Sequence, residues 1–151
     1  MAQQKETIST INDLIETLKD GQEGFRQAAE AVQDPELKSL FNEYSLQRAR
    51  FAGELQRDAI GLGESNPEKR SSAAGAMHRA WIDLKSAITK QDDHAILAEC
   101  ERGEDSAIKE YQAAMEEEEL AAPVREVISR QYAEVKRAHD RIKQLRDATA
   151  S

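Results

Sequence analysis

Polar residues interrupt the apolar stripe near the midpoint of each of four long helices that the sequence predicts. They are Gln22, Gln47, Glu104 and Gln131. Gln22 and Glu104 each follow an apolar-stripe residue by one helical turn, and Gln47, on a slightly different stripe from Arg48, is also expected to face inward. In helical bundles that bind two iron or manganese ions, a polar layer at this level holds the metals. Metal chemistry is therefore the first hypothesis to test.

The histidines do not fit a standard two-metal centre. Such bundles take one Glu from each of two helices and a Glu-x-x-His from each of the other two, because positions i and i+3 project from one face. None of His78, His94 and His139 has a Glu three positions earlier. The predicted layer also holds one carboxylate, whereas a pair of divalent ions needs several to balance its charge. We expect no metal or other cofactor and assign no catalytic or cofactor-binding residue.

Two interpretations of these polar residues stay open. In the first, the layer is a hydrogen-bonded remnant that fixes helix register, as single buried amides do in coiled coils. In the second, a looser site binds iron or manganese through the candidate ligands Glu23, Glu54, Glu101, Glu104 and His139. Solvated glutamates and a half-buried histidine bonded to a neighbouring carboxylate are the ordinary alternative to that site.

Other catalytic motifs are missing from the sequence. Cys100 lies between Glu99 and Glu101, so its thiolate is disfavoured and it is expected to act as a small core residue. The sequence holds no GxSxG, phosphate-binding loop, CxxC pair or Rossmann glycine pattern. The sequence therefore favours a protein that is not an enzyme, without deciding the question.

Apolar residues at alternating steps of three and four predict the helices that position these side chains. Their expected ranges are 8–33, 35–60, 72–89, 93–118 and 122–148, in a single domain over residues 1–151. Asp34-Pro35 suits a helix start, and the Gly- and Pro-containing stretch 61–70 is the one predicted linker. His78 and Trp81, one turn apart in the short helix, are expected to anchor it to the bundle.

These lengths and connections predict an all-α fold. Long helices joined by short turns pack antiparallel, so the two hairpins form an up-down four-helix bundle. The long middle connection, which carries the short extra helix, is expected to act as a crossover between the hairpins, as in ferritin-like bundles.

Several segments resemble a known group of proteins. They are NDLIETLKDGQEGF, DPELKSLF, AMHRAWIDLKSAI, ECERGEDSAIKEY and EVKRAHDRIKQL, which together cover most of the chain. The sequence resembles an uncharacterised bacterial family of four-helix-bundle proteins, a domain of unknown function within the ferritin-like superfamily. This resemblance implies the ferritin-like fold and brings no established activity with it.

Charge and composition limit the partners. The 151 residues carry a formal charge of −8, which argues against nucleic acid and anionic membranes as partners. The single cysteine and the polar start MAQQKETIST favour a cytoplasmic protein. Residues 91–120 have 2 basic and 11 acidic groups, whereas residues 121–151 have 7 basic and 4 acidic groups. The two segments are expected to attract each other, either within one hairpin or between copies of the chain.

Two functions from different classes follow from these observations. The first is a non-catalytic cytoplasmic bundle, an interaction or stress-associated protein that self-associates and keeps a degenerate ferritin-like centre. The alternative is an iron-binding or di-metal oxidase-type protein with a non-standard ligand set, which rests on fold resemblance.

Overall fold

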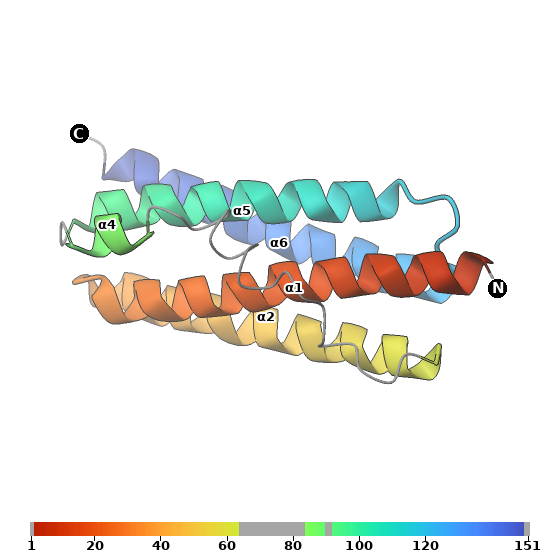
Figure 1. Ribbon diagram of the computed structural model, residues 1–151. Coiled ribbons are helices and arrows are strands. Elements are labelled where there is room, and N and C mark those ends of the chain that lie inside the picture. The colour runs from red at the N-terminus through yellow and green to blue at the C-terminus, as the bar shows by residue number, and fades with distance from the viewer. Residues whose placement is uncertain (1, 64–83, 90–91, 150–151) are drawn as a thin grey trace.

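The computed structural model describes residues 2–63, 84–89 and 92–149 (Figure 1). Its elements are α1 (Ala2–Ala31), α2 (Pro35–Gly61), α4 (Leu84–Thr89), α5 (Asp93–Met115) and α6 (Ala122–Ala148). Within these residues every regular element is a helix and there is no strand, which confirms the all-α prediction. No helix among the described residues is both long enough and apolar enough to cross a lipid bilayer.

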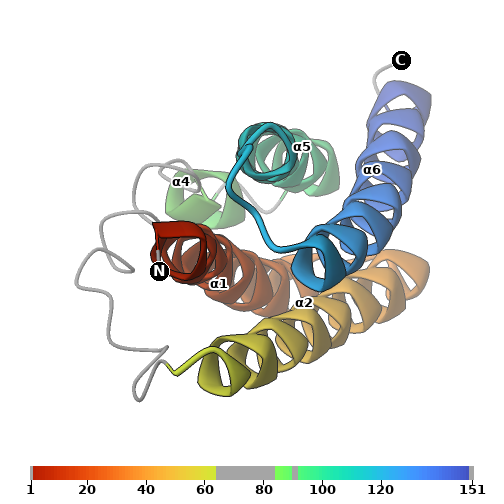
Figure 2. The same ribbon diagram turned by 90° about the vertical axis from the view of Figure 1, so that its right-hand side faces the viewer.

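The four long helices lie side by side as a helical bundle (Figures 1 and 2). α1 and α2 form one antiparallel hairpin, and α5 and α6 form the other. α2 and α5 run in the same direction, so the end of α2 and the beginning of α5 lie at opposite ends of the bundle. α4 lies beside the first turns of α5 and near α1.

Short polar contacts fix one end of both hairpins. Asp34 caps α2 by accepting a hydrogen bond from the backbone N–H of Glu36 at 2.9 Å, and Pro35 takes the first helical position, as the sequence predicts. The carboxylate of Asp93, at the start of α5, accepts the backbone N–H groups of Gln33 and Asp34 at 2.9 and 3.0 Å. The α1–α2 turn is thereby tied to the beginning of the second hairpin.

Among the long helices, two limits differ from the expected ranges by three residues or more. α1 begins at Ala2, well before residue 8, because its first residues are polar and an apolar stripe cannot mark such a start. α5 ends at Met115 and not at residue 118, since the acidic run from Glu116 to Glu119 would place negative charge on the negative end of the helix dipole. α2 ends at Gly61, and Gly63 then adopts a φ of 104°, a conformation that glycine takes without strain.

The buried apolar side chains form two clusters along the bundle. One contains Leu14, Leu18, Leu55, Tyr111 and Ile128, and the other contains Phe25, Phe41, Leu84, Ile96 and Ile142. On each of α1, α2 and α5 a gap of several residues separates the two clusters, and these gaps fall at the same level near mid-bundle. This level is where the polar layer was expected.

The predicted crossover anchor, His78 and Trp81, lies outside the described residues, as does most of the predicted linker 61–70. The described part of the crossover does reach the core, because Leu84 and Ala87 of α4 are 2% and 6% exposed and belong to the second cluster. The short helix therefore packs on the bundle through at least these two side chains.

Candidate functional site

A buried ion pair occupies the gap between the two apolar clusters. Arg48 of α2 and Glu104 of α5 are each 1% exposed. The Nη1 atom of Arg48 lies 2.5 Å from Oε1 of Glu104, and Nη2 donates to Oε2 at 2.8 Å. Both carboxylate oxygens are thus bound by one guanidinium, in the two-pronged geometry that is the strongest form of this contact.

The rest of the Arg48 side chain is also held. Its Nε donates to the side-chain oxygen of Gln47 at 3.2 Å, and its guanidinium carbon lies 5.3 Å from the centre of the Phe25 ring. A Cβ atom added at Gly21 would stand 3.6 Å from Cγ of Arg48, so α1 passes close to this side chain. A buried arginine is tolerated only when its donors are matched, and here each of the three guanidinium nitrogens has an acceptor.

The electrostatics of the centre favour a charged pair. Burial acts to lower the pKa of Arg48, but the charge and the hydrogen bonds of Glu104 outweigh it, and the pKa of Arg48 is raised. Burial, with a contribution from Glu104, raises the pKa of Tyr44 to about 12. Burial also raises the pKa of Tyr111. The pair is neutral overall, and the two tyrosines beside it stay protonated at neutral pH.

A second polar group lies within the apolar cluster that contains Leu14 and Ile128. Tyr111 of α5 and Gln131 of α6 are each 0% exposed, and the Tyr111 hydroxyl donates to Oε1 of Gln131 at 2.8 Å. The amide nitrogen of Gln131 donates to the backbone carbonyl of Phe51 at 3.3 Å and to Oε1 of Glu54 at 2.9 Å. Arg130 binds the other oxygen of Glu54. This network links α5, α6 and α2.

We predict that Tyr111→Phe lowers the free energy of unfolding by about 1–3 kcal/mol, because Oε1 of Gln131 loses its donor in a site without water access. Urea denaturation measures this loss. Tyr132→Phe is the matched control, since the Tyr132 hydroxyl contacts Gln112 at 3.2 Å in an exposed position. The control is expected to change the free energy by less than about 0.5 kcal/mol. Equal losses in the two variants would contradict the buried network.

The structure brings together only part of the expected polar layer. Glu104 and Gln131 are buried, but Gln22 and Gln47 are only half-buried. The expectation for Gln47 was wrong because the inward stripe of α2 steps from Phe41 through Ser45 to Arg48. Gln22 contributes its backbone carbonyl, which accepts a hydrogen bond from Ser45 at 2.8 Å. Sequence reasoning did not identify Arg48 as buried. Arg48 follows the apolar residue Phe41 by seven positions, a spacing that places both residues on one face of the helix.

Three of the five candidate metal ligands lie in separate places. Glu23 lies on the surface of α1, where hydrogen bonds from Arg26 and Gln27 lower its pKa to about 2. Glu54 belongs to the Gln131 network, and Glu104 is bound by Arg48.

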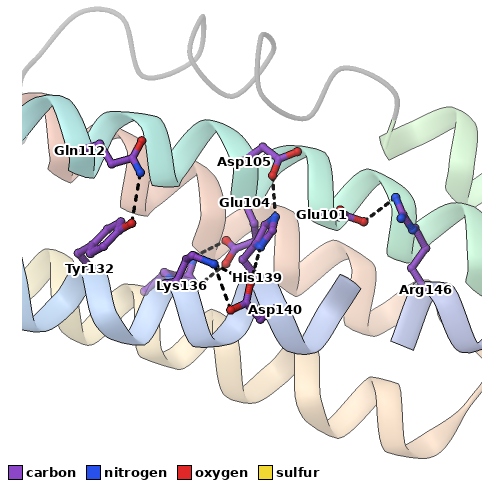
Figure 3. Close-up of polar contacts among 10 residues, drawn as sticks. Glu101, Glu104, Asp105, Gln112, Tyr132, Lys136, His139, Asp140 and Arg146 are labelled. Carbon is purple, nitrogen blue, oxygen red and sulfur yellow. Dashed lines mark hydrogen bonds and ion pairs between the residues drawn. The ribbon is translucent and has the colours of Figure 1, made fainter. Parts of the chain in front are cut away.

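The other two candidates, Glu101 and His139, lie near each other across the contact between α5 and α6, and one ligand atom of each is within 4.8 Å of the other and of Asp105. Figure 3 shows that His139 faces Asp105, whereas Glu101 points toward Arg146. Sequence reasoning missed Asp105, which follows Glu101 by one turn on the same face of α5.

Few ion pairs between described residues join the acidic helix α5 to the basic helix α6. Arg146 pairs with Glu101 at 2.7 Å, and the His139 ring contacts Asp105. Arg130 instead binds Glu54 of α2, and Arg137 binds Glu134 of its own helix. Only some of the opposite charges on the two segments are therefore paired across the contact between α5 and α6.

Cys100 lies in the second apolar cluster and is 0% exposed. Burial, reinforced by the charges of Glu104 and Glu99, raises its pKa well above the ordinary value. A raised pKa means less thiolate at a given pH.

We predict that the Cys100 thiol of the folded protein resists alkylation by iodoacetamide at pH 8 and reacts fully in urea, measured by the mass of the intact chain. Rapid labelling of the folded protein would contradict this placement.

Comparison with known proteins agrees with the sequence resemblance at the level of the family. No curated protein matches the chain. The model of the family described as Domain of unknown function (DUF2383) matches residues 6–117. The match runs from the first turns of α1 to the acidic turn after α5 and so includes Arg48 and Glu104. The chain belongs to this family, a domain of unknown function (DUF2383).

Proposed function

We propose that the protein is a non-catalytic helical bundle of ferritin-like topology in which an ion pair replaces the metal centre. The observation that carries this proposal is the position of Arg48, whose guanidinium lies at mid-bundle and binds both oxygens of Glu104. The parallel course of α2 and α5 supports the ferritin-like assignment, because one long crossover between two hairpins requires that direction.

Electrostatics argue against a cation beside this pair. A divalent ion about 4 Å from a guanidinium is repelled by about 8 kcal/mol at an effective dielectric constant of about 20. The oxygens of Glu104 would also have to leave Arg48, which would strand a buried positive charge. The ion pair therefore serves folding and helix register. The function of the protein then depends on contacts that its surface makes with a partner.

The surface feature that supports an interaction role lies on α2. Leu46 and Ile60 are 63% and 58% exposed, and they stand four helical turns apart on one face. A groove beside Leu46 is lined by Ala49 and Phe51 and edged by Arg50, Arg57 and the ion pair between Arg130 and Glu54. Apolar contact area with a basic rim is suited to an acidic protein partner.

We infer that this partner is a second copy of the chain. The run from Glu116 to Glu119 is mostly exposed, and residues 91–120 carry the negative charge that complements the arginines at the groove. A contact between the acidic turn of one copy and the groove of the next joins two different surfaces, so it can propagate beyond a dimer. It should also weaken as salt screens the charges.

Metal analysis tests the non-catalytic part of the proposal. Protein purified without chelator and then desalted is expected to hold less than about 0.2 equivalents of iron or manganese, given the ligand deficit of the core. It should oxidise ferrous ion no faster than buffer does. Near-stoichiometric iron with rapid oxidation would overturn the proposal and favour the iron-oxidising alternative.

Light scattering coupled to gel filtration tests the self-association. At low salt the mass is expected to exceed the 16.9 kDa of one chain and to fall as salt is added. The double variant Leu46→Ser/Ile60→Ser should be monomeric, whereas Ala133→Ser on the exposed face of α6 should behave as the wild type. A monomer at every concentration and salt level would refute self-association and leave the ion-pair proposal standing.

A further inference from the structure

Three metal-ligating side chains lie near one another at the contact between α5 and α6. In Figure 3, Asp105 faces the His139 ring and Glu101 points toward Arg146. Glu101 and Asp105 lie one turn apart on α5, and His139 reaches them from α6. One ligand atom from each residue lies within 4.8 Å of the other two. Among the described residues this is the group of histidine and acidic side chains that is close enough to share one ion.

The His139 ring is held between two carboxylates. Its Nε2 atom lies 2.6 Å from Oδ1 of Asp105, and its Nδ1 atom lies 3.1 Å from Oδ1 of Asp140. Asp140 is itself fixed by Lys136, whose Nζ lies 2.9 Å away. A carboxylate on one ring nitrogen orients the ring and leaves the other nitrogen for a metal, which is the usual support of a histidine ligand.

Glu101 is the least exposed of the three side chains, and its carboxylate already has a charged partner. The residue is 8% exposed, and its Oε1 atom is buried and accepts no hydrogen bond from a described residue. Nη1 of Arg146 lies 2.7 Å from this oxygen as an ion pair, without the alignment of a hydrogen bond. A metal ion bound to this oxygen would repel Arg146, whose side chain is 33% exposed and can turn toward solvent when the ion binds.

We propose that Glu101, Asp105 and His139 form a surface site for a zinc ion. One imidazole and two carboxylates suit zinc, with a fourth position left for water. Tetrahedral bonds of about 2.1 Å place neighbouring ligand atoms about 3.4 Å apart. Asp105 therefore has to move away from Nε2 by less than about 1 Å, and its 53% exposed side chain has room to do so. Glu101, which lies within 4.8 Å of the other two ligands, has to approach them and leave Arg146.

This site goes beyond the proposed function and does not depend on it. It shares no residue with the buried ion pair, because the oxygens of Glu104 face Arg48 in the core. A zinc ion bound here would join α5 to α6 and offset the negative charge of α5. It would replace the proton on Nε2 of His139 and leave the contact between Nδ1 and Asp140 in place.

Calorimetric titration of the chelator-treated full chain with zinc chloride tests the proposal. One equivalent is expected to bind with micromolar affinity. His139→Gln and Asp105→Asn should each weaken binding by at least about tenfold. His94→Gln is the matched control, because His94 contacts the Thr149 hydroxyl at 2.9 Å and has no carboxylate partner at that distance in the described structure.

A second measurement guards against variants that unfold. Circular dichroism should show the same helix content in all four proteins, since His139 and Asp105 lie outside both apolar clusters. Cobalt added in place of zinc should give the visible absorption of a tetrahedral site in the wild type and lose it in folded His139→Gln. Absence of saturable binding, or binding that is unchanged in both site variants, would overturn the zinc site without affecting the ion-pair proposal.

Discussion

Arg48→Met is expected to lower the free energy of unfolding by about 3–5 kcal/mol, because it leaves the Glu104 carboxylate buried without its partner. Methionine fills much of the volume of arginine, so the loss measures the stranded charge more than a cavity. The measurement is urea denaturation followed by circular dichroism. Arg137→Met is the matched control, because the Arg137 side chain is 70% exposed, and it should cost less than about 0.5 kcal/mol.

The double variant separates the ion pair from simple packing. Arg48→Met combined with Glu104→Leu removes both charges and replaces them with apolar groups of similar size. Such replacements of buried pairs are often neutral or stabilising, so the double variant should be more stable than Arg48→Met alone. If the two single losses add up in the double variant, the residues do not act as a pair.

Phe25→Ala has the second-largest expected effect, a loss of about 3–5 kcal/mol. Phe25 is 0% exposed, and its ring centre lies 5.8 Å from that of Phe41 and 5.4 Å from that of Tyr44. It also covers one side of the Arg48 guanidinium. Truncation therefore removes buried apolar area and opens a cavity next to the charged pair.

Phe25→Leu is the companion variant, because leucine keeps most of the volume. It should lose less than half as much stability as Phe25→Ala, and thermal unfolding together with urea denaturation will rank the two. If both variants unfold like the wild type, the Phe25 ring does not contribute to the stability of the core.

The apolar spacing predicted the helices well where a helix has a continuous buried stripe. Asp34-Pro35 marked the start of α2 because both residues act locally, through a side-chain cap and a fixed φ. The start of α1 and the end of α5 depended on polar residues, whose helical state is decided by neighbours in the fold and by the helix dipole.

The sequence predicted where the polar centre lies but not all of the residues that form it. Glu104 and Gln131 were identified because a polar residue on an apolar stripe is conspicuous. Arg48 escaped because arginine is almost always exposed, and only a partner 56 residues away makes its burial favourable. The group of Glu101, Asp105 and His139 likewise depends on how α5 and α6 pack, which no local pattern contains.

The central claim is that an ion pair stands where a metal centre would lie. Its most direct test is the thermal unfolding of the His139→Gln variant, with excess ferrous or manganous ion and then with EDTA. This background removes the proposed surface site, so any remaining metal effect reports on the core. An ion bound in the core adds stability by mass action, and the prediction is an unchanged Tm in both conditions. A Tm that rises with metal, falls with EDTA and loses this response when Glu104→Gln is added would contradict the claim.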